Sequence, residues 1–153
     1  MEIRTAKKIR WAGKICFLLY MLLLVYLMFF FEAYGRTIAD RKYLYNFIPF
    51  KEIRRFIVYR ETLGISVMIT NIIGNVAGFV PFGFILPLIY KNKRKWWLIT
   101  FLTMEFSMVI ELLQLLLKVG SCDVDDVILN TLGGFLGYVL FYICNRIRRR
   151  LDG

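Results

Sequence analysis

Four apolar stretches, each long enough to cross a lipid bilayer, constrain this chain more than any other feature of its sequence. They cover approximately residues 15–34, 65–90, 96–117 and 127–145. A helix needs about 20 residues to cross the ~30 Å hydrocarbon layer of a membrane. Because hydrophobic residues make up 59% of the 153-residue chain, little remains for a separate soluble domain. We therefore predict one all-α domain over residues 1–153, a bundle of four transmembrane helices.

The first apolar stretch is expected to be an uncleaved anchor and not a signal peptide. Its basic flank, which includes Lys7, Lys8 and Lys14, suits either interpretation. The stretch is longer than the roughly 7–15 apolar residues usual in a signal peptide. The segment that follows offers only Ala33 and Gly35 as small residues for cleavage.

Basic residues predict how the chain is oriented in the cell membrane. With the N-terminus inside, thirteen Lys and Arg residues lie on the cytoplasmic side and eight on the outer side. This excess favours a multi-pass protein with both termini in the cytoplasm. The net charge of +10 then reflects basic helix flanks that contact anionic lipid. No nucleic-acid partner is expected, because the basic residues lie at helix ends and form no folded basic face.

The first loop contains the pattern of a short amphipathic helix. In the segment NFIPFKEIRRFIVYRE, Pro49 stands where a helix could begin, and Ile53, Phe56 and Ile57 follow at helical spacing. Such a helix would lie in the membrane interface, with its apolar side toward the lipid. The alternative is a segment that only leads the chain back into the second span.

Polar residues in and beside the spans form three stripes. The stripes comprise Asn71 and Asn75 in the second span, Ser107, Glu111, Gln114 and Lys118 in the third, and Asp123, Asp126 and Asn130 in the fourth. Spacings of three and four residues put the members of each stripe on one side of their helix. The direction of the chain places all three stripes at the same end of the bundle. We predict that they converge there, in an acidic pocket in the outer leaflet.

Small residues predict where the helices approach each other closely. Gly133 and Gly137 form a small-xxx-small pattern in the fourth span, and Gly74 and Gly78 repeat it in the second. Such patterns let helix backbones pack against each other in a membrane. We predict that the two glycine pairs face each other.

The polar residues allow two kinds of function. As an enzyme, the chain could use Glu111, Asp123 and Asp126 for general acid–base chemistry. As a binding module, it could use a polar lining whose candidates are Asn71, Asn75, Gln114, Asp125 and Asn130. Carboxylates also suit Mg²⁺ or Ca²⁺, but the helix dipole alone favours acidic residues at helix starts. We therefore predict neither a metal site nor a cofactor.

The residue types in the chain exclude several kinds of catalytic and metal site. The chain contains no histidine, which rules out Ser-His-Asp hydrolysis and HExxH zinc sites. Its three cysteines match no metal-binding spacing. They also indicate no disulfide framework, because Cys122 falls at the opposite end of the spans from Cys16 and Cys144.

Four segments of the chain carry the motifs of a known family. The segments NIIGNVAGFVPFGFILPL, SMVIELLQ and DVDDVILNTLGGFLGY, together with NFIPF in the first loop, resemble the VanZ-like membrane proteins of Gram-positive bacteria. The resemblance extends over about residues 43–142, in the family's order and spacing. Ser121 and Cys122 depart from it, because a basic or aromatic residue is frequent there in relatives. Glu105 is not part of the motif.

The resemblance implies a role in low-level resistance to glycopeptide antibiotics of the teicoplanin type. The polar pocket would then act on or bind a membrane lipid, a lipid-linked cell-wall precursor or a lipoglycopeptide. The alternative is a non-catalytic membrane binding or interaction module with no antibiotic role. In either case the chain could assemble as a homo-oligomer.

Overall fold

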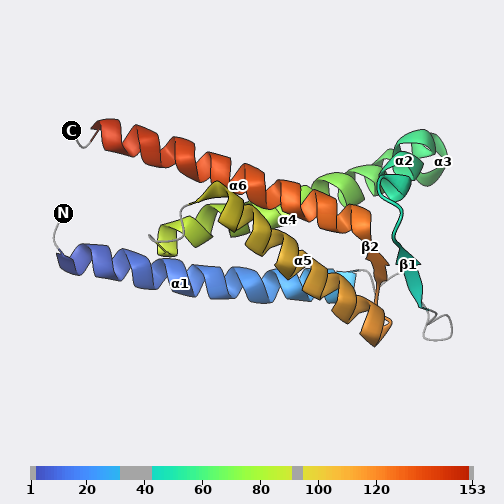
Figure 1. Ribbon diagram of the computed structural model, residues 1–153, viewed down its shortest axis with the longest axis horizontal. Helices are drawn as coiled ribbons and strands as arrows, with labels where there is room; N and C mark the ends of the chain where they lie inside the picture. The colour runs from blue at the N-terminus through green and yellow to red at the C-terminus, as the bar shows by residue number, and fades with distance from the viewer. Residues whose placement is uncertain (1–2, 32–42, 91–94, 152–153) are drawn as a thin grey trace.

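Four long helices make up most of the protein, as the sequence predicts (Figure 1). The computed structural model describes residues 3–31, 43–90 and 95–151. The long helices are α1 (Ile3–Tyr26), which continues through the π-helical turn η1 (Leu27–Phe31), then α4 (Ile65–Ile89), α5 (Trp96–Leu117) and α6 (Val124–Leu151). All four are long and apolar enough to cross a membrane. Ala33 and Gly35, which bear on signal cleavage, lie outside the described residues.

The helices pack unequally around α6. The most extensive contact is between α4 and α6, and α5 covers a second side of α6. The first helix packs mainly on α4. Only 6% of its apolar window is buried inside the protein, against 33% in each of the other three long helices. Three helices therefore form the packed body, and α1 lies at its edge.

Glycines of α6 bring its backbone against α4, but not in the predicted pairing. A Cβ atom on Gly133 would collide with the Val76 carbonyl, and a Cβ on Gly137 would collide with the Val80 carbonyl. A Cβ on Gly74 would meet nothing within 4 Å. The prediction that Gly74 and its partner glycine face this pair is therefore wrong.

The glycine that meets α6 from α4 lies further along the helix. A Cβ on Gly83 would overlap the Gly134 carbonyl, so the two helix backbones touch at this point. Gly78 instead faces α1, where the Leu24 side chain lies 3.5 Å from the position of its Cβ. The spacing of the glycines identified the correct face of α6 but the wrong face of α4.

Aromatic side chains fill the space between α1, α4 and α5. Phe79 and Phe82 of α4 are buried, and the ring of Phe82 stacks on that of Phe106 with centroids 5.5 Å apart. The Tyr20 hydroxyl of α1 donates a hydrogen bond of 2.7 Å to the Gly78 carbonyl. This bond gives the hydroxyl a partner between two apolar helices, where an unpaired polar group would be costly.

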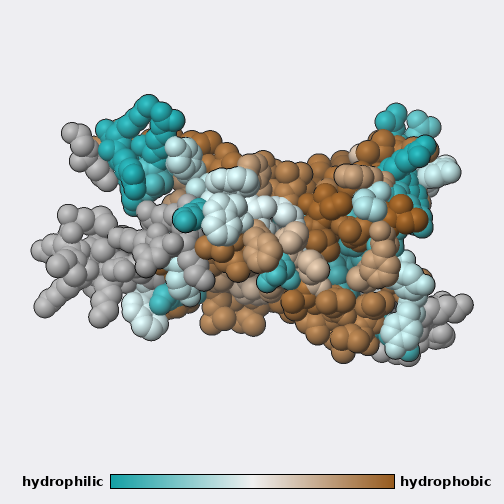
Figure 2. Space-filling view, in the orientation of Figure 1, coloured by the Kyte–Doolittle hydropathy of each residue, from teal (hydrophilic) through white to brown (hydrophobic). Residues whose placement is uncertain are grey.

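The first loop folds over the end of the bundle at which α4 and α6 begin. Its strand β1 (Leu44–Asn46) pairs in parallel with β2 (Ser121–Asp123), the short strand before α6. The loop then forms α2 (Lys51–Val58) and α3 (Arg60–Leu63), which confirms the short helix predicted there. Figure 2 shows an apolar band around the middle of the bundle and hydrophilic residues toward both ends.

Candidate functional site

The polar stripes lead to the end of the bundle that carries β1, β2 and α2. Several of the polar residues there are almost completely buried: Asn46, Glu111, Gln114, Asp123, Asp125 and Asn130. Burial of this many polar groups is stable only when they hydrogen-bond to one another or to the backbone. Their partners therefore show what each residue contributes.

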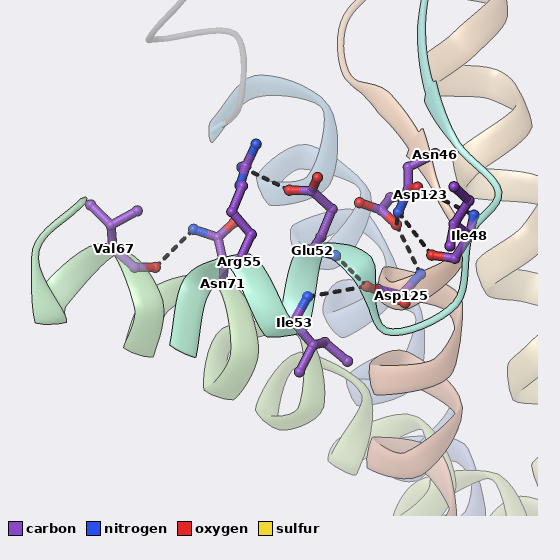
Figure 3. Close-up of polar contacts among 9 residues, drawn as sticks. All are labelled: Asn46, Ile48, Glu52, Ile53, Arg55, Val67, Asn71, Asp123 and Asp125. Carbon is purple, nitrogen blue, oxygen red and sulfur yellow. Dashed lines mark hydrogen bonds and ion pairs between the residues drawn. The ribbon is translucent and has the colours of Figure 1, made fainter. Parts of the chain in front are cut away.

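Asp125 caps the short helix of the first loop from a distant part of the chain. Its carboxylate accepts hydrogen bonds from the backbone N–H groups of Glu52 at 2.8 Å and Ile53 at 3.1 Å (Figure 3). It also accepts one from the backbone N–H of Phe50. These groups belong to the start of α2, where N–H groups have no partner inside the helix. A carboxylate there also interacts favourably with the helix dipole. Asp125, which is 1% exposed, thus fixes the first loop on α6.

Asp123 connects the first loop, the start of α6 and α5. Its Oδ1 accepts one hydrogen bond of 3.0 Å from the Asn46 amide and another of 2.9 Å from the Asp125 backbone N–H. The second bond is an N-cap, and it explains why α6 already begins at Val124. The backbone N–H of Asp123 donates to Glu111 Oε2 at 2.8 Å. We call Asn46, Glu111, Asp123 and Asp125 the anchor cluster.

Asp126 lies next to the anchor cluster but has a different partner. Its Oδ1 accepts a hydrogen bond of 2.6 Å from the Asn75 amide of α4. Both side chains are half-buried, whereas Asp125 beside them is buried. We call these two residues the Asn75–Asp126 pair. Among the three aspartates of DVDD, only Asp126 reaches the surface to this extent.

Asn71 lies near the same end of α4 but forms no hydrogen bond with the other candidates among the described residues. Its amide donates to the carbonyl of Val67, one turn back in its own helix, at 2.8 Å. Figure 3 shows Asn71 and Val67 apart from the carboxylates of Asp123 and Asp125. The shared helical face of Asn71 and Asn75 therefore did not give them a shared environment.

Two further candidates lie between the helices. The Asn130 amide donates to Ser107 Oγ at 2.8 Å and joins α6 to α5. The Gln114 amide donates to the Met28 carbonyl at 2.9 Å and joins α5 to the end of α1. Within the described part of the chain, Gln114 Oε1 and Asn130 Oδ1 have no hydrogen-bond donor. Each is a buried acceptor to which a hydroxyl, an amine or a water molecule could donate.

Lys118, at the end of α5, and Cys122, in β2, also lie at this end of the bundle. Lys118 places its ammonium group 4.3 Å from the ring centre of Tyr43, a cation–π contact between α5 and the first loop. Burial raises the pKa of the Cys122 thiol, and the nearby carboxylates of Glu111 and Asp123 raise it further. The thiol is therefore held in its less reactive, protonated form.

Asn46 was not among the sequence candidates, although it belongs to the anchor cluster. Its amide reaches Asp123, and its Oδ1 accepts the Ile48 N–H at 3.2 Å. The NFIPF motif was the available signal, because the asparagine opens it.

In the described residues, no group of three or more Asp, Glu, Cys or His side chains is arranged to hold a metal ion.

Comparison with known proteins gives two matches and one negative result. The family model described as VanZ/LLP1 matches residues 17–145. Protein VanZ from Enterococcus faecium is 36% identical over 81 residues, which are 50% of this chain and 47% of that protein. The chain thus aligns with about half the length of this relative. No solved structure matches.

Proposed function

The chain belongs to the VanZ/LLP1 family of membrane proteins, and on that premise we propose that it contributes to low-level resistance against teicoplanin-type glycopeptides. It does so by binding an amphiphilic molecule at the Asn75–Asp126 pair. The molecule is a lipid-linked cell-wall precursor or a lipoglycopeptide. Both classes combine a polar head, which suits the acceptors at this end, with an acyl or prenyl chain, which suits the apolar band below.

The Asn75–Asp126 pair is the observation that supports this proposal. A carboxylate at the end of a membrane bundle attracts amine and hydroxyl donors, and Asp126 is half-buried, so that a ligand can reach it. The hydrogen bond to Asn75 fixes the position of the carboxylate between α4 and α6. A preorganised acceptor of this kind loses little conformational freedom on binding.

The anchor cluster favours binding over catalysis at this end. Glu111, Asp123 and Asp125 each accept a backbone N–H, and all three are buried. A general acid or base must reach the proton that it transfers. Carboxylates that hold the backbone in this way serve to position the site.

We place the Asn75–Asp126 pair in the outer leaflet of the cell membrane, with both termini in the cytoplasm. The start of α1 and the end of α6 lie at one end of the bundle, and the anchor cluster lies at the other (Figure 1). Basic residues such as Arg146 and Arg148 mark the end with the termini, which agrees with the positive-inside rule. The basic residues at 91–94, which also support this orientation, lie outside the described residues.

The test is drug susceptibility in a sensitive Gram-positive host. The wild type, Asp126→Asn and the control Asn71→Ala are expressed at matched membrane levels and challenged with teicoplanin and with vancomycin. We expect the wild type and Asn71→Ala to raise the inhibitory concentration of teicoplanin only. Asp126→Asn should lose this shift, because its amide can no longer attract a cationic donor.

Two results would contradict the proposal in different ways. A full teicoplanin shift in Asp126→Asn would show that the pair is not the binding site. No shift in the wild type would remove the antibiotic role from this chain and leave a binding module with another ligand. Thermal stabilisation of the purified protein by added teicoplanin would then decide whether the molecule is bound at all.

A further inference from the structure

Glu105 carries a carboxyl group on the outer surface of the bundle. The buried residues of α5, among them Ile99, Thr103 and Ser107, face α4 and α6. Glu105 is exposed, and its position on the helical wheel is opposite to this face. Its exposed neighbours on α5 are the large apolar side chains of Phe101, Met108, Val109 and Leu112. The carboxyl group therefore stands alone on a surface that suits lipid.

The depth of Glu105 prevents it from reaching water. At 1.5 Å per residue, it lies about 13 Å from the start of α5 and about 18 Å from its end, which is near the middle of the hydrocarbon layer. A glutamate side chain is shorter than either distance. Unlike a lysine near a helix end, it cannot bring its polar group to the interface.

The described residues do not satisfy this carboxyl group. No hydrogen bond or ion pair of Glu105 occurs among residues 3–31, 43–90 and 95–151. Ionisable groups inside membranes almost always face a protein interior and have a polar partner there. The outward face of α5 is thus expected to be covered by another protein segment that supplies a polar group at the same depth.

We propose that this face is the contact between two copies of the chain, and that their Glu105 side chains pair across a two-fold axis. An axis along the membrane normal keeps each residue at its own depth, so that Glu105 meets Glu105. A carboxyl group can both donate and accept a hydrogen bond, so two of them can pair without a cation. Among the described Lys and Arg residues, Lys95 and Lys118 lie at the two ends of α5, and Lys14 lies near the start of the apolar window of α1. They cannot supply a counter-ion at the depth of Glu105.

The proposal is independent of what the Asn75–Asp126 pair binds, and cysteine cross-linking in vesicles tests it. The background carries Cys16→Ser, Cys122→Ala and Cys144→Ser, so that only an added cysteine can react. The purified full chain with Met108→Cys, one turn from Glu105, should cross-link to a dimer on oxidation. Leu140→Cys, on an exposed position of α6, is the matched control and should not.

Substitutions at Glu105 then separate pairing from simple apolar contact. Glu105→Gln should keep the cross-link, because an amide also donates and accepts. Glu105→Leu should weaken dimerisation about threefold to tenfold, the effect of losing a hydrogen bond between membrane helices. A chain that stays monomeric, or that cross-links equally through Leu140→Cys, would overturn the proposal. So would a dimer that Glu105→Leu does not weaken.

Discussion

Asp125 and Asp126 are neighbours in the chain, yet they belong to two different regions of the molecule. Asp125, in the anchor cluster, is 1% exposed and binds backbone N–H groups from the first turn of α2. Asp126, in the Asn75–Asp126 pair, is half-buried and accepts a hydrogen bond from a side-chain amide of α4. Two identical carboxylates thus hold two unlike positions, one inside the structure and one at its surface.

The difference shows how one helix start can carry both a buried structural carboxylate and an accessible one. Successive residues of a helix point about 100° apart, so Asp125 faces the first loop while Asp126 faces α4. The loop closes over the first carboxylate and leaves the second near the surface. An acidic cluster at the end of a membrane helix can therefore contain both structural and ligand-accessible residues, and burial tells them apart.

Loss of the Asp125 carboxylate should have the largest effect on folding. Asp125→Ala leaves three backbone N–H groups at the start of α2 without their acceptor. Because hydrogen bonds to a charged group contribute about 1.5–3 kcal/mol each, partly replaced by water, we expect unfolding to become easier by about 3 kcal/mol. Thermal unfolding in detergent, followed by circular dichroism, measures this change. An unchanged midpoint would show that the anchor cluster does not hold the loop.

Much of the architecture could be predicted because a membrane restricts it strongly. The third span was expected at residues 96–117 and α5 covers Trp96–Leu117, since apolar length alone sets such a helix. The fourth was expected from residue 127, but α6 begins at Val124. Asp123 and Asp125 are charged, yet both are buried, because hydrogen bonds from backbone N–H groups offset the cost of burial.

The partners within the site could not be predicted from spacing. Helical periodicity identifies the residues on one face, but it does not tell which neighbouring helix that face meets, or whether it meets one. For this reason Asn71 was grouped with Asn75, and Gly74 was paired with the wrong helix segment. The contact of Asp125 with Glu52 spans 73 positions and depends on how the first loop folds back. No local pattern in the sequence encodes that path.

A smaller effect in the same region should appear in the rate at which the Cys122 thiol is labelled. Its thiol is 6% exposed and lies in β2, which pairs with β1. Asn46→Ala removes the amide that joins β1 to Asp123, so β1 should separate more often and expose the thiol. We expect maleimide to label Cys122 about tenfold faster, as for a loss of about 1.4 kcal/mol in local stability.

The labelling experiment needs a background in which only this thiol reacts, so Cys16 and Cys144 are changed to serine. Burial and the nearby carboxylates raise the pKa of Cys122, so its labelling should be slow near neutral pH and should accelerate as the pH rises. Equal rates in Asn46→Ala and the parent chain would show that β1 stays paired without the amide.

Substitutions of the two asparagines of α4 test whether the hydrogen bond between Asn75 and Asp126 contributes to stability. Asn75→Ala removes the donor of the 2.6 Å hydrogen bond to Asp126, and we expect a loss of about 1 kcal/mol in unfolding free energy. Asn71→Ala removes only an exposed hydrogen bond within one turn of its own helix, so its effect should stay within about 0.5 kcal/mol. Denaturation of both variants in the same detergent gives the comparison. Equal losses would mean that the shared helical face, and not the contact with α6, determines their contributions.

The most direct comparison applies one substitution to both neighbours. Asp125→Asn leaves a single acceptor oxygen and points an NH₂ group at the N–H donors of α2, so we expect a loss of about 2 kcal/mol. Asp126→Asn can still accept from Asn75 through its remaining oxygen and removes a charge from a half-buried position. Its unfolding free energy should change by less than about 0.5 kcal/mol. A loss as large as that of Asp125→Asn would show that Asp126 also holds the fold, and a resistance defect in that variant could then not be assigned to ligand binding.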